Sequence, residues 1–141
     1  MQSAKRTRLV VDTNVLVSIL IGKELGKLKP MLRSGQVQLV LSPILLDEFK
    51  AVVERPHLRK YFAPSAVDRF IALVSRTGLL AADVPPPGPV SRDPKDDYLL
   101  MLAATSGATL LITGDKDLLA IGSFKKVRII KPSELMQELA G

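Results

Sequence analysis

Short apolar runs typical of buried strands alternate with helical segments along this chain, and this alternation constrains the fold more than any other feature. The helical segments carry apolar residues at spacings of three and four, whereas the short runs are rich in Val, Leu and Ile. The strand-like runs are residues 8–11, 37–41, 79–84, 109–113 and 127–130. Helices between consecutive strands are typical of a parallel sheet that is covered on both faces. We therefore predict an α/β fold.

Local chemistry marks where the helices begin and end. Ser42 followed by Pro43 is typical of an N-cap and a first helical position, and Gly78 closes the helix that Pro64 opens. The proline-rich segment 84–92 is predicted to be a stiff surface connection. We find neither an internal repeat nor a domain linker. Residues 1–141 are therefore predicted to form one domain, with residues 1–7 as a flexible N-terminus.

Composition excludes several classes of protein. The 141 residues include 47% hydrophobic and 24% charged residues, which fits one globular domain and rules out a disordered chain. The absence of cysteine excludes disulfides, cysteine zinc sites and a thiol nucleophile. A single histidine, His57, excludes a two-histidine acid–base ribonuclease. The apolar runs are too short for a membrane span, and the N-terminus lacks the features of a signal peptide, so a cytoplasmic protein is expected.

The distribution of charge is more informative than the net charge of +6. Half of the 14 acidic residues lie in four short segments, while the rest of the chain is strongly basic. A basic body with concentrated acids suits an enzyme that holds cations and binds nucleic acid; the alternative is a solvated basic surface with helix caps. The seven clustered acids are Asp12, Glu48, Asp93, Asp96, Asp97, Asp115 and Asp117.

Four of these acids are predicted to meet at one edge of the sheet. Asp12 ends the first strand-like run, and Asp115 lies two residues past the fourth. Glu48 is near the start of the helix after the second run, and Asp97 is in the first turn of the helix that leads to the fourth. Ligands of such sheets bind beyond the carboxyl ends of the strands. We therefore expect these carboxylates to converge there.

Most of these acids also have a structural explanation. Asp12, Thr13 and Asn14 are all good N-caps, but three polar residues straight after a buried strand fit a site better. Glu48 is too far into its helix for a capping box. It is a candidate site residue only because Asp12 is expected to lie nearby.

The third and fourth segments are partly explained by capping. Asp93 is expected to be an N-cap and Asp96 to face the helix N-terminus, which leaves Asp97 as the candidate ligand. Asp115 can cap the next helix with one oxygen and bind a cation with the other. Asp117 is an alternative that could share or replace its role.

Other catalytic sites are missing from the sequence. There is no dinucleotide fingerprint, no phosphate-binding P-loop and no serine nucleophile elbow. A site made of carboxylates alone suits hard cations such as Mg²⁺ and Mn²⁺. Such ions activate water and stabilise charge in phosphoryl displacement.

Four segments of the chain combine these features in a particular order and spacing: LVVDTNVLVS, LSPILLDEF followed by VVERP, DPKDDYLLMLAATSGA, and LLITGDKDLL. Together they resemble PIN-domain ribonucleases, and most of all the PIN toxins of bacterial toxin–antitoxin systems. The resemblance runs from about Arg8 to Leu139. It implies a three-layer α/β/α sandwich around a parallel sheet of about five strands in the order 3-2-1-4-5.

The resemblance also implies roles for individual residues. Asp12, Glu48 and Asp97 match the first three family acids, and Asp115 matches the acid of the T-x-D motif. Asp12 and Asp97 would be the principal Mg²⁺ ligands, with Glu48 and Asp115 binding a second ion or positioning water. The residues expected to orient these carboxylates are Asn14 and Thr113, with Asp117 beside them. Because Asp96 and Asp97 are adjacent, either of them could be the third family acid.

The function implied is a Mg²⁺- or Mn²⁺-dependent endoribonuclease that cleaves single-stranded or loop RNA. Its products would carry 5′-phosphate and 3′-hydroxyl ends, and its partners would be a small antitoxin protein and a second copy of the chain. One alternative is a non-catalytic PIN module that binds RNA or a partner protein. Another is a haloacid-dehalogenase-like phosphatase, which needs a second acid where this chain has Asn14.

Overall fold

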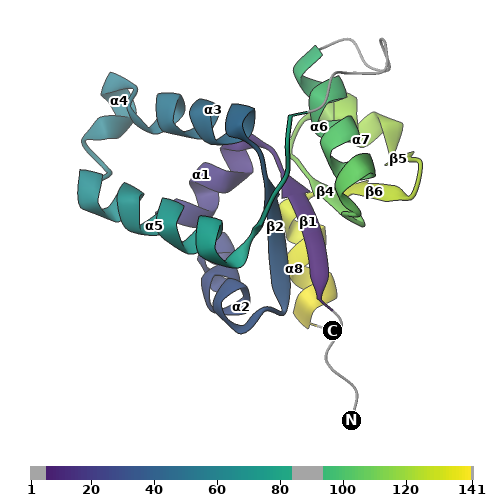
Figure 1. The fold of residues 1–141 in the computed structure, drawn as a ribbon, viewed down its shortest axis with the longest axis horizontal. Helices are drawn as coiled ribbons and strands as arrows, with labels where there is room; N and C mark the ends of the chain where they lie inside the picture. Colours follow the sequence, from purple (N-terminus) through teal and green to yellow (C-terminus); the bar gives the residue numbers. More distant parts are fainter. Residues whose placement is uncertain (1–5, 84–93, 141) are drawn as a thin grey trace.

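The computed structural model describes residues 6–83 and 94–140, and its centre is a six-stranded sheet in the order β3-β2-β1-β4-β6-β5 (Figure 1). Neighbouring strands are parallel except at one edge, where β5 runs antiparallel to β6. The strands are β1 (Thr7–Val11), β2 (Val37–Leu41), β3 (Leu79–Leu80), β4 (Leu110–Ile112), β5 (Ser123–Phe124) and β6 (Val127–Ile130). The predicted fold class and the order of the five expected strands are confirmed.

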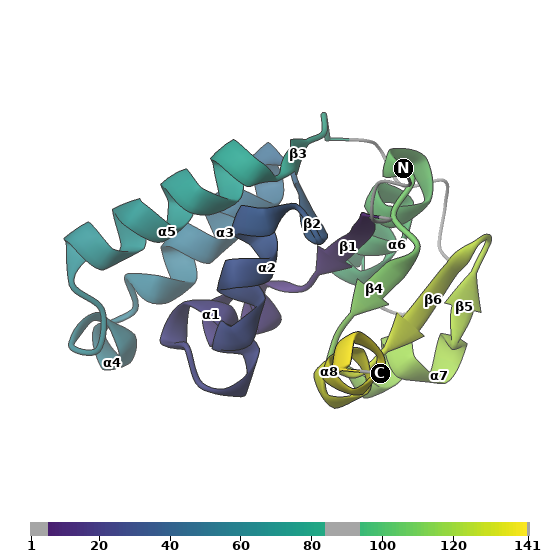
Figure 2. The same cartoon turned by 90° about the horizontal axis from the view of Figure 1, so that it is seen from below.

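Helices lie on both sides of this sheet (Figure 2). They are α1 (Thr13–Ile21), the 3₁₀ turn η1 (Glu24–Lys27), α2 (Leu28–Ser34), α3 (Pro43–Val53), α4 (Pro56–Arg59), α5 (Pro64–Thr77), α6 (Pro94–Ser106), α7 (Lys116–Ile121) and α8 (Pro132–Ala140). Within the described ranges, none of them combines the length and the apolarity that a membrane-spanning segment needs.

The central strand β1 is buried on both faces because its alternate side chains enter two different cores. Leu9 and Val11 belong to a core with α1, α2, α3, α5 and α8, whereas Val10 belongs to a core with α6 and α7. All three side chains are completely buried. Successive strand residues point to opposite faces, so a continuous apolar run is what a doubly covered strand requires. The buried run ends at Val11, and Asp12 is therefore the first residue beyond β1.

Most predicted boundaries agree with the structure. Ser42 caps α3, since its hydroxyl oxygen accepts a hydrogen bond from the Leu45 N–H at 3.3 Å. Gly22 ends α1 with a φ of 89°, a conformation that favours glycine.

The observed elements differ from the prediction in three places. The third strand is two residues long instead of six, and residues 25–34, whose apolar residues recur at helical spacing, are divided between η1 and α2. Pro30 lacks an N–H and is accommodated in the first turn of α2, where no intrahelical bond is lost. The short antiparallel strand β5 was not predicted, because two residues are too few to show a strand pattern. Segment 84–92 and the predicted cap Asp93 lie outside the described residues.

Candidate active site

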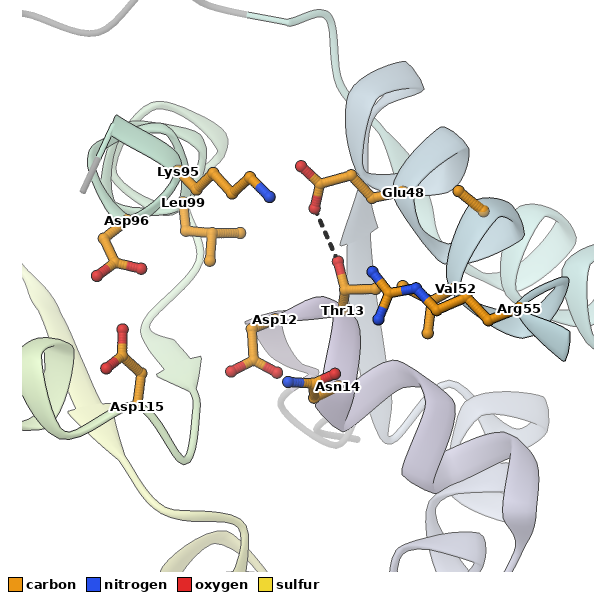
Figure 3. A pocket seen from close by; sticks show the side chains of 11 residues that line it. Asp12, Thr13, Asn14, Glu48, Val52, Arg55, Lys95, Asp96, Leu99 and Asp115 are labelled. Carbon is orange, nitrogen blue, oxygen red and sulfur yellow. Dashed lines mark hydrogen bonds between the residues drawn. The ribbon is translucent and has the colours of Figure 1, made fainter. Parts of the chain in front are cut away.

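A cleft of about 490 Å³ lies at the carboxyl edge of the sheet, beyond the ends of β1 and β4 (Figure 3). This is the edge where parallel α/β sheets bind ligands. Three of the four predicted carboxylates, those of Asp12, Glu48 and Asp115, line it together. The full lining is Asp12, Thr13, Asn14, Glu48, Ala51, Val52, Arg55, Lys95, Asp96, Leu99 and Asp115.

Asp12 is held by both of its carboxylate oxygens. Oδ1 accepts a hydrogen bond from the Val15 N–H at 2.8 Å and so caps α1, and Oδ2 accepts one from the Thr113 hydroxyl at 2.6 Å. Each carboxylate oxygen has two lone pairs, so each retains acceptor capacity. The capping and ligand interpretations of Asp12 are therefore compatible. Asn14 is exposed and lies beside Asp12 in the cleft (Figure 3).

Thr113 connects two of the acidic residues. Its fully buried hydroxyl group donates to Asp12 Oδ2 and accepts from the Asp115 backbone N–H at 3.0 Å. Asp115 in turn caps α7, since its Oδ1 accepts from the Asp117 N–H at 3.1 Å. Asp117 does not line the cleft. The side chain of Thr113 thus fixes the separation of β1 and β4 at the point where both acids emerge.

Glu48 reaches the cleft from α3 and is oriented by a residue that sequence reasoning did not include among the site residues. The Thr13 hydroxyl donates to Glu48 Oε2 at 2.9 Å across 35 positions of sequence (Figure 3). The pattern Asp12-Thr13-Asn14 had indicated polar function at this position without showing which partner Thr13 binds. The bond joins the first turn of α1 to the middle of α3.

The structure places Asp96, rather than Asp97, in the cleft. Both side chains are buried, but Asp97, which was predicted to lie there, is not part of the lining, whereas Asp96 is. Consecutive residues of a helix point about 100° apart, so only one of the two can face the cleft squarely. Leu99, which is three positions from Asp96 and therefore on the same side of α6, also lines it. Figure 3 shows Asp96 facing Asp115 across the cleft.

Two cationic side chains flank the carboxylates. Arg55 lines the cleft from the end of α3, and Lys95 lines it from the start of α6, with its ammonium directed toward Glu48 (Figure 3). Neither was predicted individually. A signal for Arg55 was available, because Glu48, Val52 and Arg55 are spaced by four and three residues and share a helix face.

The two helices that form the walls of the cleft are tied together behind it. The Tyr98 hydroxyl on α6 is hydrogen-bonded to the Ser42 hydroxyl at the start of α3, and it donates to Asp83 Oδ1 at 2.7 Å. Asp83 also accepts from the Ile44 N–H at 3.3 Å. Burial raises the pKa of Tyr98 to about 12, so its hydroxyl remains protonated and able to donate.

The chemistry of the donor set fits a hard divalent cation. The cleft offers carboxylate oxygens and neither sulfur nor imidazole, and oxygen donors are what Mg²⁺ and Mn²⁺ prefer. Among the described residues, no group of three or more acidic, histidine or cysteine side chains is drawn together tightly enough to hold a metal. Carboxylates that repel one another are expected to spread in this way unless a cation offsets their charge.

Comparison with known proteins places the chain in a family. Residues 8–117 match the PIN domain, and the chain belongs to this family. It is 27% identical to the uncharacterised protein MJ1680 of Methanocaldococcus jannaschii, covering 94% of this chain and 92% of that protein.

Two solved structures share the fold. The crystal structure of PAE2754 from Pyrobaculum aerophilum has a TM-score of 0.63 and 18% identity over 95% of this chain and 90% of that one. That of VapC20, a toxin of Mycobacterium tuberculosis that cleaves the sarcin-ricin loop, has a TM-score of 0.53 and 17% identity over 85% of this chain and 98% of that one.

Proposed function

We propose that this protein is an endoribonuclease that hydrolyses phosphodiester bonds of single-stranded or loop RNA with Mg²⁺ or Mn²⁺. One observation carries the proposal: the cleft at the carboxyl edge of the sheet is lined by four carboxylates and flanked by Arg55 and Lys95. Carboxylates alone would repel the negative charge of a phosphodiester. Such a site can therefore bind a phosphodiester only with the help of cations. Membership of the PIN family and the likeness to the fold of VapC20 support this choice.

In this proposal Asp12, Asp96 and Asp115 hold the cation, and Asp96 takes the position for which the sequence had favoured Asp97. The ion would activate water and stabilise the charge that develops on the phosphate. Thr113 holds the Asp12 carboxylate in place, and Thr13 does the same for Glu48, which is positioned to orient the attacking water. Arg55 and Lys95 bind the substrate phosphates. The products carry 5′-phosphate and 3′-hydroxyl ends.

We further propose that the protein acts in the cytoplasm as the toxin of a toxin–antitoxin pair, as a dimer inhibited by a small antitoxin protein. The fold of VapC20 supports this biological role. Expression of the chain alone should arrest growth of its host, and co-expression of a short neighbouring reading frame should relieve the arrest. Growth that is unaffected by an active nuclease would contradict the toxin role.

The first prediction concerns the metal. Purified protein should cleave a mixed-sequence RNA in Mg²⁺ or Mn²⁺ and should lose this activity in EDTA, because the carboxylates need a cation to accept a phosphate. Gel analysis of end-labelled RNA measures both. The Asp12→Asn variant, purified in parallel, controls for contaminating ribonuclease. Cleavage that persists in EDTA would refute the metal mechanism, and the absence of cleavage with metal would favour a module that only binds.

The second prediction separates Asp115 from Asp117. Asp115→Asn should lower kcat by on the order of a hundredfold, because one charged group is lost from the cleft while the amide oxygen can still cap α7. Asp117→Asn should lower kcat by less than about threefold, since Asp117 lies outside the cleft. Turnover of both variants is compared at saturating Mg²⁺. A larger loss for Asp117→Asn would show that the fourth acid is misassigned.

A further inference from the structure

The turn between α3 and α5, which we call the α4 turn (residues 55–61), presents an unusual surface. Five of its seven residues expose charged, imidazole or aromatic side chains. Tyr61 is 68% exposed, the largest fraction among the exposed large hydrophobic residues of the described chain. The next residue, Phe62, instead packs against the core. The exposed polar and aromatic residues are Arg55, His57, Arg59, Lys60 and Tyr61.

The α4 turn is closed by hydrogen bonds within its own backbone. The N–H groups of Leu58 and Arg59 both donate to the Arg55 carbonyl, at 2.8 and 2.9 Å, and the Tyr61 N–H donates to the Leu58 carbonyl at 2.9 Å. Pro56 occupies the first helical position, where its fixed φ favours the turn. The backbone that carries the Tyr61 ring is therefore part of a hydrogen-bonded turn.

The sequence of this region is mainly basic. From Lys50 to Tyr61, both included, the chain has four basic residues and one acidic residue, Glu54, and Arg59 shares a hollow between α3 and α5 with Glu54 and Asp68. Neither of the two ion pairs found among the described residues involves the α4 turn. The Lys60 ammonium lies 5.2 Å from the centre of the Tyr61 ring, so a cation and an aromatic face are presented side by side.

The turn is continuous with the candidate active site. Arg55 lines the cleft with its side chain and forms the N-terminal boundary of α4 with its backbone. Figure 1 shows α4 at the end of α3 that points away from the sheet. An RNA strand that runs along α3 past Glu48 and Arg55 therefore reaches the α4 turn.

We propose that the α4 turn is a second RNA-binding site, which holds the substrate strand outside the cleft. Arg59 and Lys60 bind backbone phosphates of a single strand, and Tyr61 stacks on one of its bases. Cations that follow the backbone beside an aromatic side chain are typical of single-stranded nucleic-acid binding. The inference rests on the proposed ribonuclease function and adds a subsite to it.

Binding of fluorescein-labelled single-stranded RNA in EDTA tests the inference without any requirement for cleavage. Arg59→Glu/Lys60→Glu should weaken binding at least about tenfold and reduce the slope of log K against log salt by about 1.4, as expected for two lost phosphate contacts. Tyr61→Ala should weaken binding about tenfold, and Tyr61→Phe, which keeps the ring, by less than about twofold. The matched control is Lys125→Glu/Lys126→Glu, an exposed pair that also has a cation beside a ring, Phe124, but lies in the turn between β5 and β6, at the edge of the sheet opposite β3.

The outcomes distinguish this inference from the proposed function. A loss of affinity in the Arg59/Lys60 variant that grows as the RNA is lengthened from about 4 to about 16 nucleotides supports the second site. Unchanged binding by the Arg59/Lys60 variant, or an equal loss in the control, overturns it even if the wild type cleaves RNA. Oligo-aspartate is tested as a competitor. If it displaces the labelled RNA as effectively as unlabelled RNA does, the inference is overturned in favour of an acidic polypeptide as the ligand. A wild type that binds through the α4 turn but cleaves nothing supports the inference and refutes the proposed catalysis.

Discussion

Asp96→Asn is expected to lower the rate of RNA cleavage by on the order of a hundredfold to a thousandfold, while Asp97→Asn retains activity within about tenfold. The reason is geometric: Asp96 lines the cleft opposite Asp115, whereas Asp97 does not line it. Asn has nearly the shape of Asp but lacks the charge that holds a cation. Single-turnover cleavage of one labelled RNA by both variants at saturating Mg²⁺ provides the measurement.

Thermal melting gives the control for this pair. Without metal, Asp96→Asn should melt at the same temperature as the wild type or higher, because one of several repelling carboxylates is neutralised. Mg²⁺ should raise the melting temperature of the wild type more than that of Asp96→Asn. The ion stabilises the native state by binding to it, and the variant is expected to bind the ion more weakly. An active Asp96→Asn protein beside an inactive, folded Asp97→Asn protein would reverse the assignment.

Gly78→Ala is expected to destabilise the protein by about 3 kcal/mol and to lower its melting temperature by about 10 °C. Gly78 links α5 to β3, and a Cβ there would lie 2.5 Å from the Val74 carbonyl oxygen and 2.7 Å from the Leu39 carbonyl oxygen. Both contacts are with backbone, which cannot rotate away as a side chain can. Either α5 or β2 must therefore move.

Gly26→Ala is the matched control for this substitution. A Cβ at Gly26 would meet nothing within 4 Å, so stability should change by less than about 1 kcal/mol. Urea unfolding of both variants measures the difference. If Gly78→Ala proves as stable as the wild type, the packing of α5 against β2 must be looser than the structure shows.

The sheet was largely predictable from the sequence because its central strands are buried on both faces. Leu9, Val10 and Val11 form a continuous apolar run, and the strong boundary residues Ser42, Pro43 and Gly78 separate the helices from the strands. Strand β5 has only two residues, so its pairing depends on the neighbouring β6 and not on its own sequence.

The carboxylate cleft was predictable only as far as its position at the sheet edge. Asp12 and Asp115 follow strands directly, and the end of a strand can be located from apolar runs. The choice between Asp96 and Asp97 depends on the rotation of α6, and one residue corresponds to about 100°. The bond between Thr13 and Glu48 spans 35 positions, so no local pattern contains it.

The hydrogen bond between Asp12 and Thr113 joins residues 101 positions apart. During synthesis, Asp12 leaves the ribosome long before its partner has been made, and β4 must then be inserted beside β1 before Thr113 reaches it. The acidic cleft is therefore absent from every nascent chain that lacks its last quarter. A chain that stops early would carry most of the cleft residues without the cleft, so the complete cleft forms only after translation is nearly finished.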